Sequence, residues 1–162
     1  MSDINAEKMR ALLDQVEIHM QRLSSANGKC SALFPMDEAR YRELDDAEIE
    51  HIDQLLYRFT KLQDALGAKL FPAIVSVLRE DADALTIFDT LAVLERAGAI
   101  PDQSGWMHIR ELRNQITHEY ENDAPRGTAM LNGVYDTVPE LLHIAGQAKT
   151  FTSDRILPSL MQ

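Results

Sequence analysis

The sequence predicts an all-α protein, an up-and-down bundle of four long helices and one shorter helix. Apolar residues recur at spacings of three and four along nearly the whole chain, as they do on the buried face of a helix. No segment alternates apolar and polar residues in the manner of a strand. The 162 residues are 45% apolar with only 7 Gly and 6 Pro, which fits one globular domain over residues 1–162.

The first helix is expected from about Ile4 to Ser25. Its apolar stripe consists of Met9, Leu12, Leu13, Val16, Met20 and Leu23. The following stretch, SSANGKCSALFP, breaks this spacing with Asn27-Gly28 and Pro35, residue types that favour turns. Residues 26–44 are therefore expected to form a loop-rich insertion.

The second helix is expected to begin at Asp45 or Asp46, where several acids complement the positive end of the helix dipole. Its stripe, the most regular in the chain, consists of Ile49, Ile52, Leu55, Leu56, Phe59, Leu62 and Leu66. Pro72 should kink or end this helix, because proline cannot donate a backbone hydrogen bond. A further apolar turn is expected at residues 73–78.

The third helix is expected from about Asp83 to Gly98, a residue that suits the left-handed position after a helix end. Its apolar residues are Leu85, Phe88, Leu91 and Leu94. Ser104 is the expected N-cap of a fourth helix, over residues 105–122.

Pro125 and Gly127 mark the turn before a fifth helix. The apolar residues of the fifth helix are Leu131, Val134, Val138, Leu141, Ala145 and Ala148. A bend is expected at Pro139, and residues 152–162 form a tail that docks or frays.

Composition excludes several classes of protein. The formal charge of −10 argues against a broad nucleic-acid-binding surface, because phosphate binding depends on clustered Lys and Arg, but it leaves room for a small basic pocket. A single cysteine, Cys30, rules out an internal disulfide framework. Without a signal peptide or a run of about 18 apolar residues, the expectation is a cytoplasmic protein with no membrane partner. No cofactor-binding or metal-ligand motif is present, so no cofactor and no metal is expected.

The segment RNQITHEY, Arg113 to Tyr120, carries the functional signal. On a helix of about 100° per residue, Arg113 lies within the apolar stripe, whereas Asn114 and His118 share a neighbouring flank. An arginine in that stripe needs a partner, because an unpaired buried charge is costly. It could bind a carboxylate such as Asp64 or Glu95, face a second copy of the chain, or hold an anion.

These side chains suit RNA cleavage without a metal. That reaction needs a base for the ribose 2′-hydroxyl proton or an acid for the leaving oxygen, and cationic groups on the phosphorane-like transition state. Histidine titrates near neutral pH, arginine supplies a permanent forked charge, and Asn114 could hold the phosphate or the ribose. Because one chain offers a single histidine in the segment, a symmetric dimer is part of the hypothesis.

RNQITHEY resembles the R-x4-H-x-Y motif of the HEPN superfamily, and its Arg-Asn start is similar to that of the HepT-like toxins. The resemblance is sharp over Trp106–Tyr120 and general over the preceding helices. It implies an all-α bundle that dimerises around the motif, metal-independent ribonuclease activity and a minimal nucleotidyltransferase antitoxin as partner. Carried over by position, Arg113, Asn114 and His118 would be catalytic, and Tyr120 would receive AMP from the antitoxin.

The leading hypothesis is thus a toxin-like endoribonuclease that acts on RNA as a homodimer, with Arg110 and Arg126 supporting phosphate binding. The alternative is a non-catalytic HEPN module that binds a nucleotide or a nucleotidyltransferase partner, including as the antitoxin side of a pair. A cationic cleft around the motif would favour the enzyme, and acids over it would favour the binding module. A purely structural dimer would require Arg113 to be fully engaged within its own chain and His118 to be buried or capped.

Overall fold

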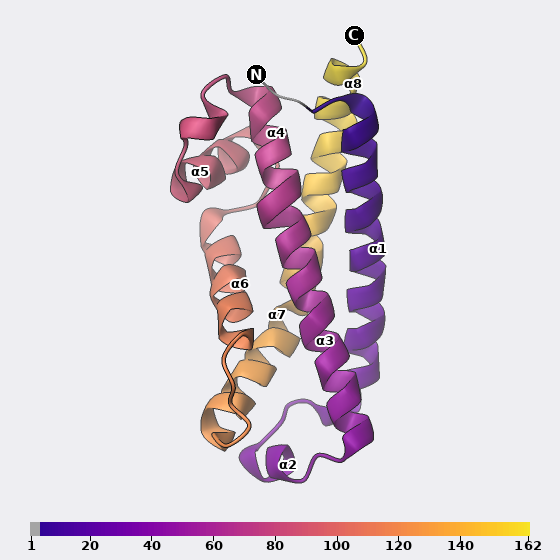
Figure 1. Cartoon of the computed structure of the whole chain (residues 1–162), viewed down its shortest axis with the longest axis vertical. Helices are drawn as coiled ribbons and strands as arrows, with labels where there is room; N and C mark the ends of the chain where they lie inside the picture. The colour runs from indigo at the N-terminus through magenta and orange to yellow at the C-terminus, as the bar shows by residue number, and fades with distance from the viewer. Residues whose placement is uncertain (1–3) are drawn as a thin grey trace.

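A computed structural model describes residues 4–162, and every regular element in this range is helical, which confirms the all-α prediction. The chain descends through α1, rises through α3 and α4, descends through α5 and α6, and rises through α7 and α8 (Figure 1). Short 3-10 turns (η1, η3) and π-helical turns (η2, η4) join some helices. The elements are α1 Ala6–Cys30, η1 Ser31–Leu33, α2 Glu38–Arg42, α3 Asp46–Asp64, η2 Ala65–Leu70, α4 Phe71–Leu78, η3 Ala82–Ala84, α5 Ile87–Ala97, α6 Gln103–Ile116, α7 Ala124–Phe151, η4 Thr152–Ile156 and α8 Leu157–Leu160.

One apolar core lies between α1, α3, α6 and α7, and it contains most of the expected stripe residues. Trp106 is buried at its centre, edge-on to Phe71 with ring centroids 4.7 Å apart. Gly67 allows this approach, because a Cβ there would lie 2.9 Å from the Trp106 ring. Phe88 was expected in the core but is 60% exposed. Within residues 4–162, no helix is both long enough and apolar enough to cross a bilayer.

The first helix is longer than expected, since Asn27 and Gly28 lie inside α1 and not in a loop. Ala26 and Cys30 are both buried and extend the apolar stripe by one more turn. This packing outweighs the cost of about 1 kcal/mol that a glycine brings to a helix interior.

The remainder of the expected loop, residues 31–44, is folded against α7. The Phe34 ring stacks on Tyr135 with centroids 4.3 Å apart. The side-chain amide of Asn132 accepts from the Met36 N–H and donates to the Met36 carbonyl, both at 2.8 Å. Because α2 also lies in this segment, the expectation of a loop-rich insertion is only partly correct.

The expected start of the second helix is confirmed by a capping box, in which Asp45 and Glu48 bond each other's backbone N–H groups. The fourth helix begins earlier than expected, because Asp102 and not Ser104 is its N-cap. The Asp102 carboxylate accepts from the Gly105 N–H at 2.7 Å and from the Ser104 hydroxyl, and these bonds lower its pKa.

The third helix begins later than expected. Thr86 caps α5, so the regular helix starts four residues after Asp83, which lies in η3. Its end is as expected, since Gly98 adopts the left-handed conformation at φ 85°.

Pro72 does not end the second helix. It lies in the first turn of α4, directly after the π-helical turn η2, and the backbone stays helical from α3 through η2 to α4. A proline ring clashes with the carbonyl four residues before it, here that of Ala68. Because Ala68 lies in the widened turn, the chain accommodates the ring without ending the helix.

The fifth helix begins earlier than expected and ends at Phe151, directly before the expected tail. Asp123 caps α7, so Pro125 and Gly127 lie in its first turn and not in a loop before it. Proline is tolerated there, because its missing N–H would have had no partner within the helix. α7 continues through Pro139 to Phe151, and the tail docks as η4 and α8 with Ile156 buried.

Candidate functional site

The motif helix is shorter than expected, because α6 ends at Ile116. The Thr117 hydroxyl and N–H both bond the Asn114 carbonyl, which caps the last turn. His118 and Tyr120 consequently lie in the loop that leads to α7. The expectation that Asn114 and His118 share one helix flank was wrong.

Arg113 lies in the last turn of α6 and forms a two-pronged ion pair with Asp64, the last residue of α3. Its Nε and Nη2 donate to the two carboxylate oxygens at 3.0 and 3.1 Å. Of the partners open to Arg113, a carboxylate within the chain is the one observed. Glu95, the other expected carboxylate, instead accepts from the Gln103 backbone and side chain.

The ion pair fixes the direction of the Arg113 guanidinium while leaving part of it available. Hydrogen bonding to Asp64 raises the pKa of Arg113, against the opposing effect of burial, so the group stays cationic. Its side chain is 27% exposed, and Nη1 has no partner among residues 4–162.

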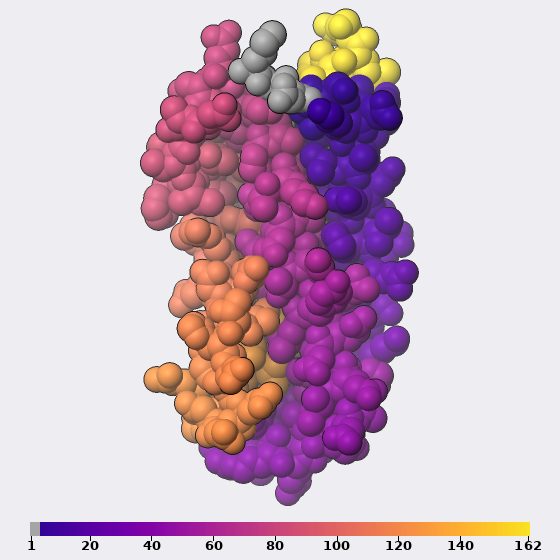
Figure 2. All heavy atoms as spheres, in the orientation of Figure 1, coloured from indigo at the N-terminus to yellow at the C-terminus, as the bar shows by residue number. Residues whose placement is uncertain are grey.

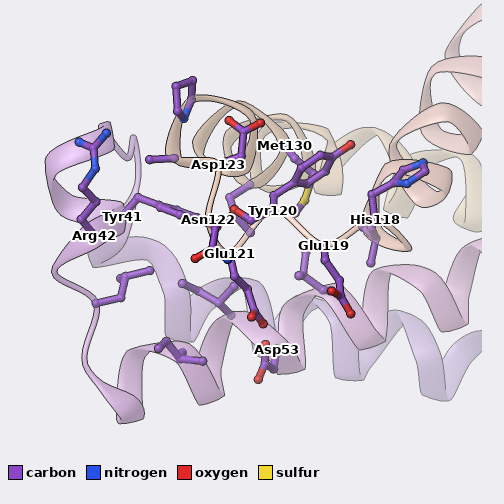
Figure 3. Close-up of a pocket in the computed structure, with 18 of the residues that line it drawn as sticks. Tyr41, Arg42, Asp53, His118, Glu119, Tyr120, Glu121, Asn122, Asp123 and Met130 are labelled. Carbon is purple, nitrogen blue, oxygen red and sulfur yellow. Dashed lines mark hydrogen bonds between the residues drawn. The ribbon is translucent and has the colours of Figure 1, made fainter.

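His118 is exposed, and its imidazole forms no hydrogen bond with any residue in the described range. Its ring lies 6.0 Å from that of Tyr120, which is half-buried. Figure 3 shows His118 and Tyr120 on one side of the loop, with Glu119 and Glu121 pointing to the opposite side, where Asp53 of α3 lies. The imidazole and the phenol therefore point away from Glu119, Glu121 and Asp53.

Tyr41 of α2 holds this loop in place and was missed in the sequence. Its hydroxyl donates to the Tyr120 carbonyl at 2.9 Å. Its ring fits over Gly127, where a Cβ would overlap the phenol. Burial raises the pKa of Tyr41, and Glu121 and Asp123 add to the effect. The available signals were an aromatic residue in a charged stretch and a glycine in the first turn of a helix.

A cavity of about 870 Å³ lies between the loop, α2 and the start of α3. Its apolar wall includes Leu44, Ile49, Ile52, Leu56, Met130 and Leu131. Its acidic residues are Asp53, Glu119, Glu121 and Asp123, and Arg42 is the only lysine or arginine among the lining residues. His118 and Tyr120 also line this cavity (Figure 3).

The remaining candidate residues lie apart from this cavity. Arg110 and Asn114 are one turn apart on α6 and share a shallow depression with Ser104 and Glu111. Arg126 is 75% exposed and pairs with Asp123 at 3.6 Å. Within residues 4–162, no side-chain contact joins either arginine to His118.

One copy of the chain thus presents a fixed guanidinium, an exposed amide and an exposed imidazole around the end of α6. It brings His118 and Tyr120 together, and it places Arg110 and Asn114 on a different surface. Searches against protein-family models, curated proteins and solved structures found no match to this chain.

Proposed function

We propose that this protein is a HEPN-type, metal-independent endoribonuclease of a toxin–antitoxin pair, with an active site shared by two copies of the chain. The observation that carries the proposal is the exposure of the His118 imidazole without a hydrogen-bond partner. A purely structural motif would bury or cap this group, as Asp64 engages Arg113. An exposed histidine just past the end of the helix that carries a fixed arginine instead suits acid–base chemistry on a phosphodiester.

In the proposed reaction, the ribose 2′-oxygen attacks phosphorus and the bond to the 5′-oxygen breaks. His118 of one copy takes the 2′-hydroxyl proton, and His118 of the other copy gives a proton to the departing 5′-oxygen. The products are a 2′,3′-cyclic phosphate and a 5′-hydroxyl. Histidine can take either role near neutral pH, because both of its protonation states are populated there.

Arg113 and Asn114 would stabilise the charge that builds on the non-bridging oxygens. Asp64 holds the Arg113 guanidinium before substrate arrives, so little ordering is required when the negative charge develops. The Asn114 amide is exposed and could bond the phosphate or the ribose. Arg110 and Arg126 would contact flanking phosphates.

Tyr120 would be the regulatory residue, modified with AMP by a nucleotidyltransferase antitoxin. Its ring lies 6.0 Å from that of His118, so an added phosphate would place negative charge beside the imidazole. That charge would repel RNA, and the nucleoside would block access to the imidazole.

A non-catalytic HEPN module is the second candidate, and the acids of the cavity favour it. Asp53, Glu119, Glu121 and Asp123 repel a polyanion and attract a basic surface. In this account the cavity and loop bind a nucleotidyltransferase partner, and His118 performs no chemistry. Nucleotide binding at the end of α6 belongs to the same alternative.

Incubation of the purified protein with RNA in the presence of EDTA tests the proposal. We expect cleavage by the parent and a loss of at least about 100-fold in His118→Ala, since general acid–base catalysis contributes that much or more. His143→Ala is the matched control, because it removes an exposed histidine from α7, outside the motif. Absence of cleavage by a folded dimer, or equal cleavage by both variants, would contradict the ribonuclease and leave the binding module.

A further inference from the structure

A line of cations follows the edge along which α1 and α3 lie side by side (Figure 1). From α3 and η2 come Arg58, Lys61 and Lys69, whose spacings of three and eight place them on one helix edge. From α1 come His19 and Arg22, three residues apart on the facing edge. On the α1 edge the residues at these helical spacings include Leu12, Gln15 and Ala26, and none is a carboxylate. On the α3 edge Asp64 follows Lys61 by three residues, and Arg113 engages it.

None of these cations has an acidic partner in the part of the chain that the structure describes. Arg22, Arg58, Lys61 and Lys69 form no salt bridge, although the chain has 26 acids and a formal charge of −10. Asp64, the first acid after Lys61, is engaged by Arg113. The six residues of this edge, His19, Arg22, Tyr57, Arg58, Lys61 and Lys69, are termed the α1–α3 strip. Figure 2 shows α1 and α3 together on one face of the molecule.

Two polar atoms within the strip are buried without a hydrogen-bond partner, Nδ1 of His19 and Nε of Arg58. Such atoms are rare, because leaving them unpaired costs free energy. The pKa of His19 is lowered, first by burial and then by the positive charges of Arg58, Lys61 and Lys69. The lysines and arginines of the strip therefore concentrate positive charge that no salt bridge neutralises among residues 4–162.

Tyr57 adds an aromatic surface to the strip. Tyr57 is 49% exposed. The Arg58 guanidinium carbon and the Lys61 Nζ lie 5.1 and 5.4 Å from the ring centroid. Both groups lie over the ring, so the strip combines an aromatic surface with positive charge, the two features with which proteins bind single-stranded nucleic acid.

We propose that the α1–α3 strip binds the sugar–phosphate backbone of single-stranded RNA, with one base stacked on Tyr57. Phosphate oxygens would supply the acceptors that Arg58, Lys61 and Lys69 lack within the chain. From Arg58 to Lys69 the strip extends about 16 Å at 1.5 Å per residue, which is long enough for several phosphates. Asp64 follows Lys61 by three residues and pairs with Arg113, so the strip passes close to the helix that carries the motif.

Two other occupants fit less well. A symmetric contact with a second copy would set the strip against itself and bring like charges together. An acidic polypeptide would neutralise the cations but would offer nothing to stack on Tyr57. The benefit of the strip to catalysis rests on the proposed ribonuclease function, whereas binding itself requires no cleavage.

Fluorescence anisotropy with a labelled 12-nucleotide 2′-O-methyl uridine strand tests the strip alone, because the blocked 2′-oxygen prevents cleavage. The triple variant Arg58→Gln, Lys61→Gln, Lys69→Gln should bind at least tenfold more weakly than the parent. The slope of the logarithm of its association constant against the logarithm of the salt concentration should be smaller in magnitude by about 2. Each of the three lost phosphate contacts contributes about 0.7 to this slope for a single strand. The control triple Arg10→Gln, Arg96→Gln, Arg155→Gln makes the same charge change at exposed positions elsewhere and should bind within twofold of the parent.

A second pair of variants tests the stacked base. Tyr57→Ala should weaken binding about fivefold or more, since stacking is worth about 1–3 kcal/mol per base, and Tyr57→Phe should restore it. Circular dichroism checks the fold of each variant.

The possible outcomes separate this proposal from the ribonuclease. Equal weakening by both triples, no binding by the parent, or preferential displacement of the RNA by poly-glutamate overturns the strip. Binding that depends on the strip in a protein that does not cut unmodified RNA supports the strip and contradicts the nuclease. If the parent cleaves RNA and the strip variants bind RNA as well as the parent does, the nuclease is supported and the strip is contradicted.

Discussion

At the scale of single residues, the ion pair between Arg113 and Asp64 affects both the stability of the fold and the orientation of a group in the proposed active site. A part-exposed ion pair of this kind stabilises a protein by only about 0–1 kcal/mol. Its larger effect is to orient the guanidinium, because the two bonds fix both the position and the plane of the group. The structural and catalytic readings of Arg113 are therefore compatible.

Asp64→Asn separates these two effects. We expect the free energy of unfolding to fall by at most about 1 kcal/mol, because the pair is part exposed. RNA cleavage should fall more than tenfold, mainly in kcat, since the guanidinium loses its orientation. Asp136→Asn, at an exposed site on α7, is the control. A loss of stability without any loss of turnover would show that the pair is only structural.

His19 makes stability depend on pH in a direction that the structure fixes. Its pKa in the folded protein lies below the ordinary value of 6.5, because of burial and then Arg58, Lys61 and Lys69. As pH falls below that value, the unfolded chain takes up the proton more readily, so the folded state loses stability. We expect the parent to lose more stability between pH 7 and 5 than His19→Gln does, as measured by urea unfolding. His143→Gln should behave like the parent.

At the scale of elements, two prolines lie where a helix widens and not where it ends. The π-helical turns η2 and η4 each finish two residues before a proline, Pro72 and Pro158. In both, the carbonyl four residues before the proline lies within the widened turn. Each proline predicts a disturbed helix from the local sequence. The packing of the helical segments before and after it keeps the helix continuous.

Tyr41 of α2 packs on Gly127 of α7 and bonds the Tyr120 carbonyl in the loop after α6. A substitution at Gly127 should therefore disturb the motif loop. Gly127→Ala should destabilise the protein by about 1–3 kcal/mol, because a Cβ there forces the Tyr41 ring to move. Amide hydrogen exchange should rise in residues 117–123 as the Tyr41–Tyr120 bond is lost. Gly146→Ala in the same helix meets only ordinary contacts and should stabilise α7 by up to about 1 kcal/mol. Equal effects of the two substitutions would contradict this account of Gly127.

At the scale of the whole molecule, one copy carries one imidazole at the motif, so the proposed reaction needs a dimer. Refolding the parent with an excess of His118→Ala chain should lower cleavage per parent chain, because mixed dimers hold one imidazole instead of two. The same mixture without refolding is the control, since its subunits have not exchanged. Unchanged cleavage after exchange would place a complete site in each chain.

Charge is also distributed at this scale. A formal charge of −10 suggested that a broad nucleic-acid-binding surface is absent, yet four lysines and arginines of the α1–α3 strip share one edge without a salt bridge among residues 4–162. Net charge sums over all faces, whereas a bound phosphate responds to the nearest groups. Only the pairing of α1 with α3 brings His19 beside Arg58.

The sequence by itself determined the helical class, the apolar stripes and several helix ends. Helical periodicity and capping are local: Asp45, Gly98 and the stripe of α7 act through neighbours within one or two turns. It also predicted that Arg113 needs a partner and gave Asp64 and Glu95 as candidate carboxylates, and the structure shows Asp64.

Only the tertiary structure decided how far α1 and α6 extend, and what holds the motif loop. Cys30 and Ala26 continue α1 because α3 and α7 bury them, whereas α6 ends at Ile116, where the Thr117 hydroxyl and N–H bond the Asn114 carbonyl. The bond from Tyr41 to Tyr120 joins residues 79 positions apart in the chain, and no local pattern encodes such a contact. Where helix and loop differ little in free energy, burial decides which of them forms, and burial depends on how the whole bundle packs.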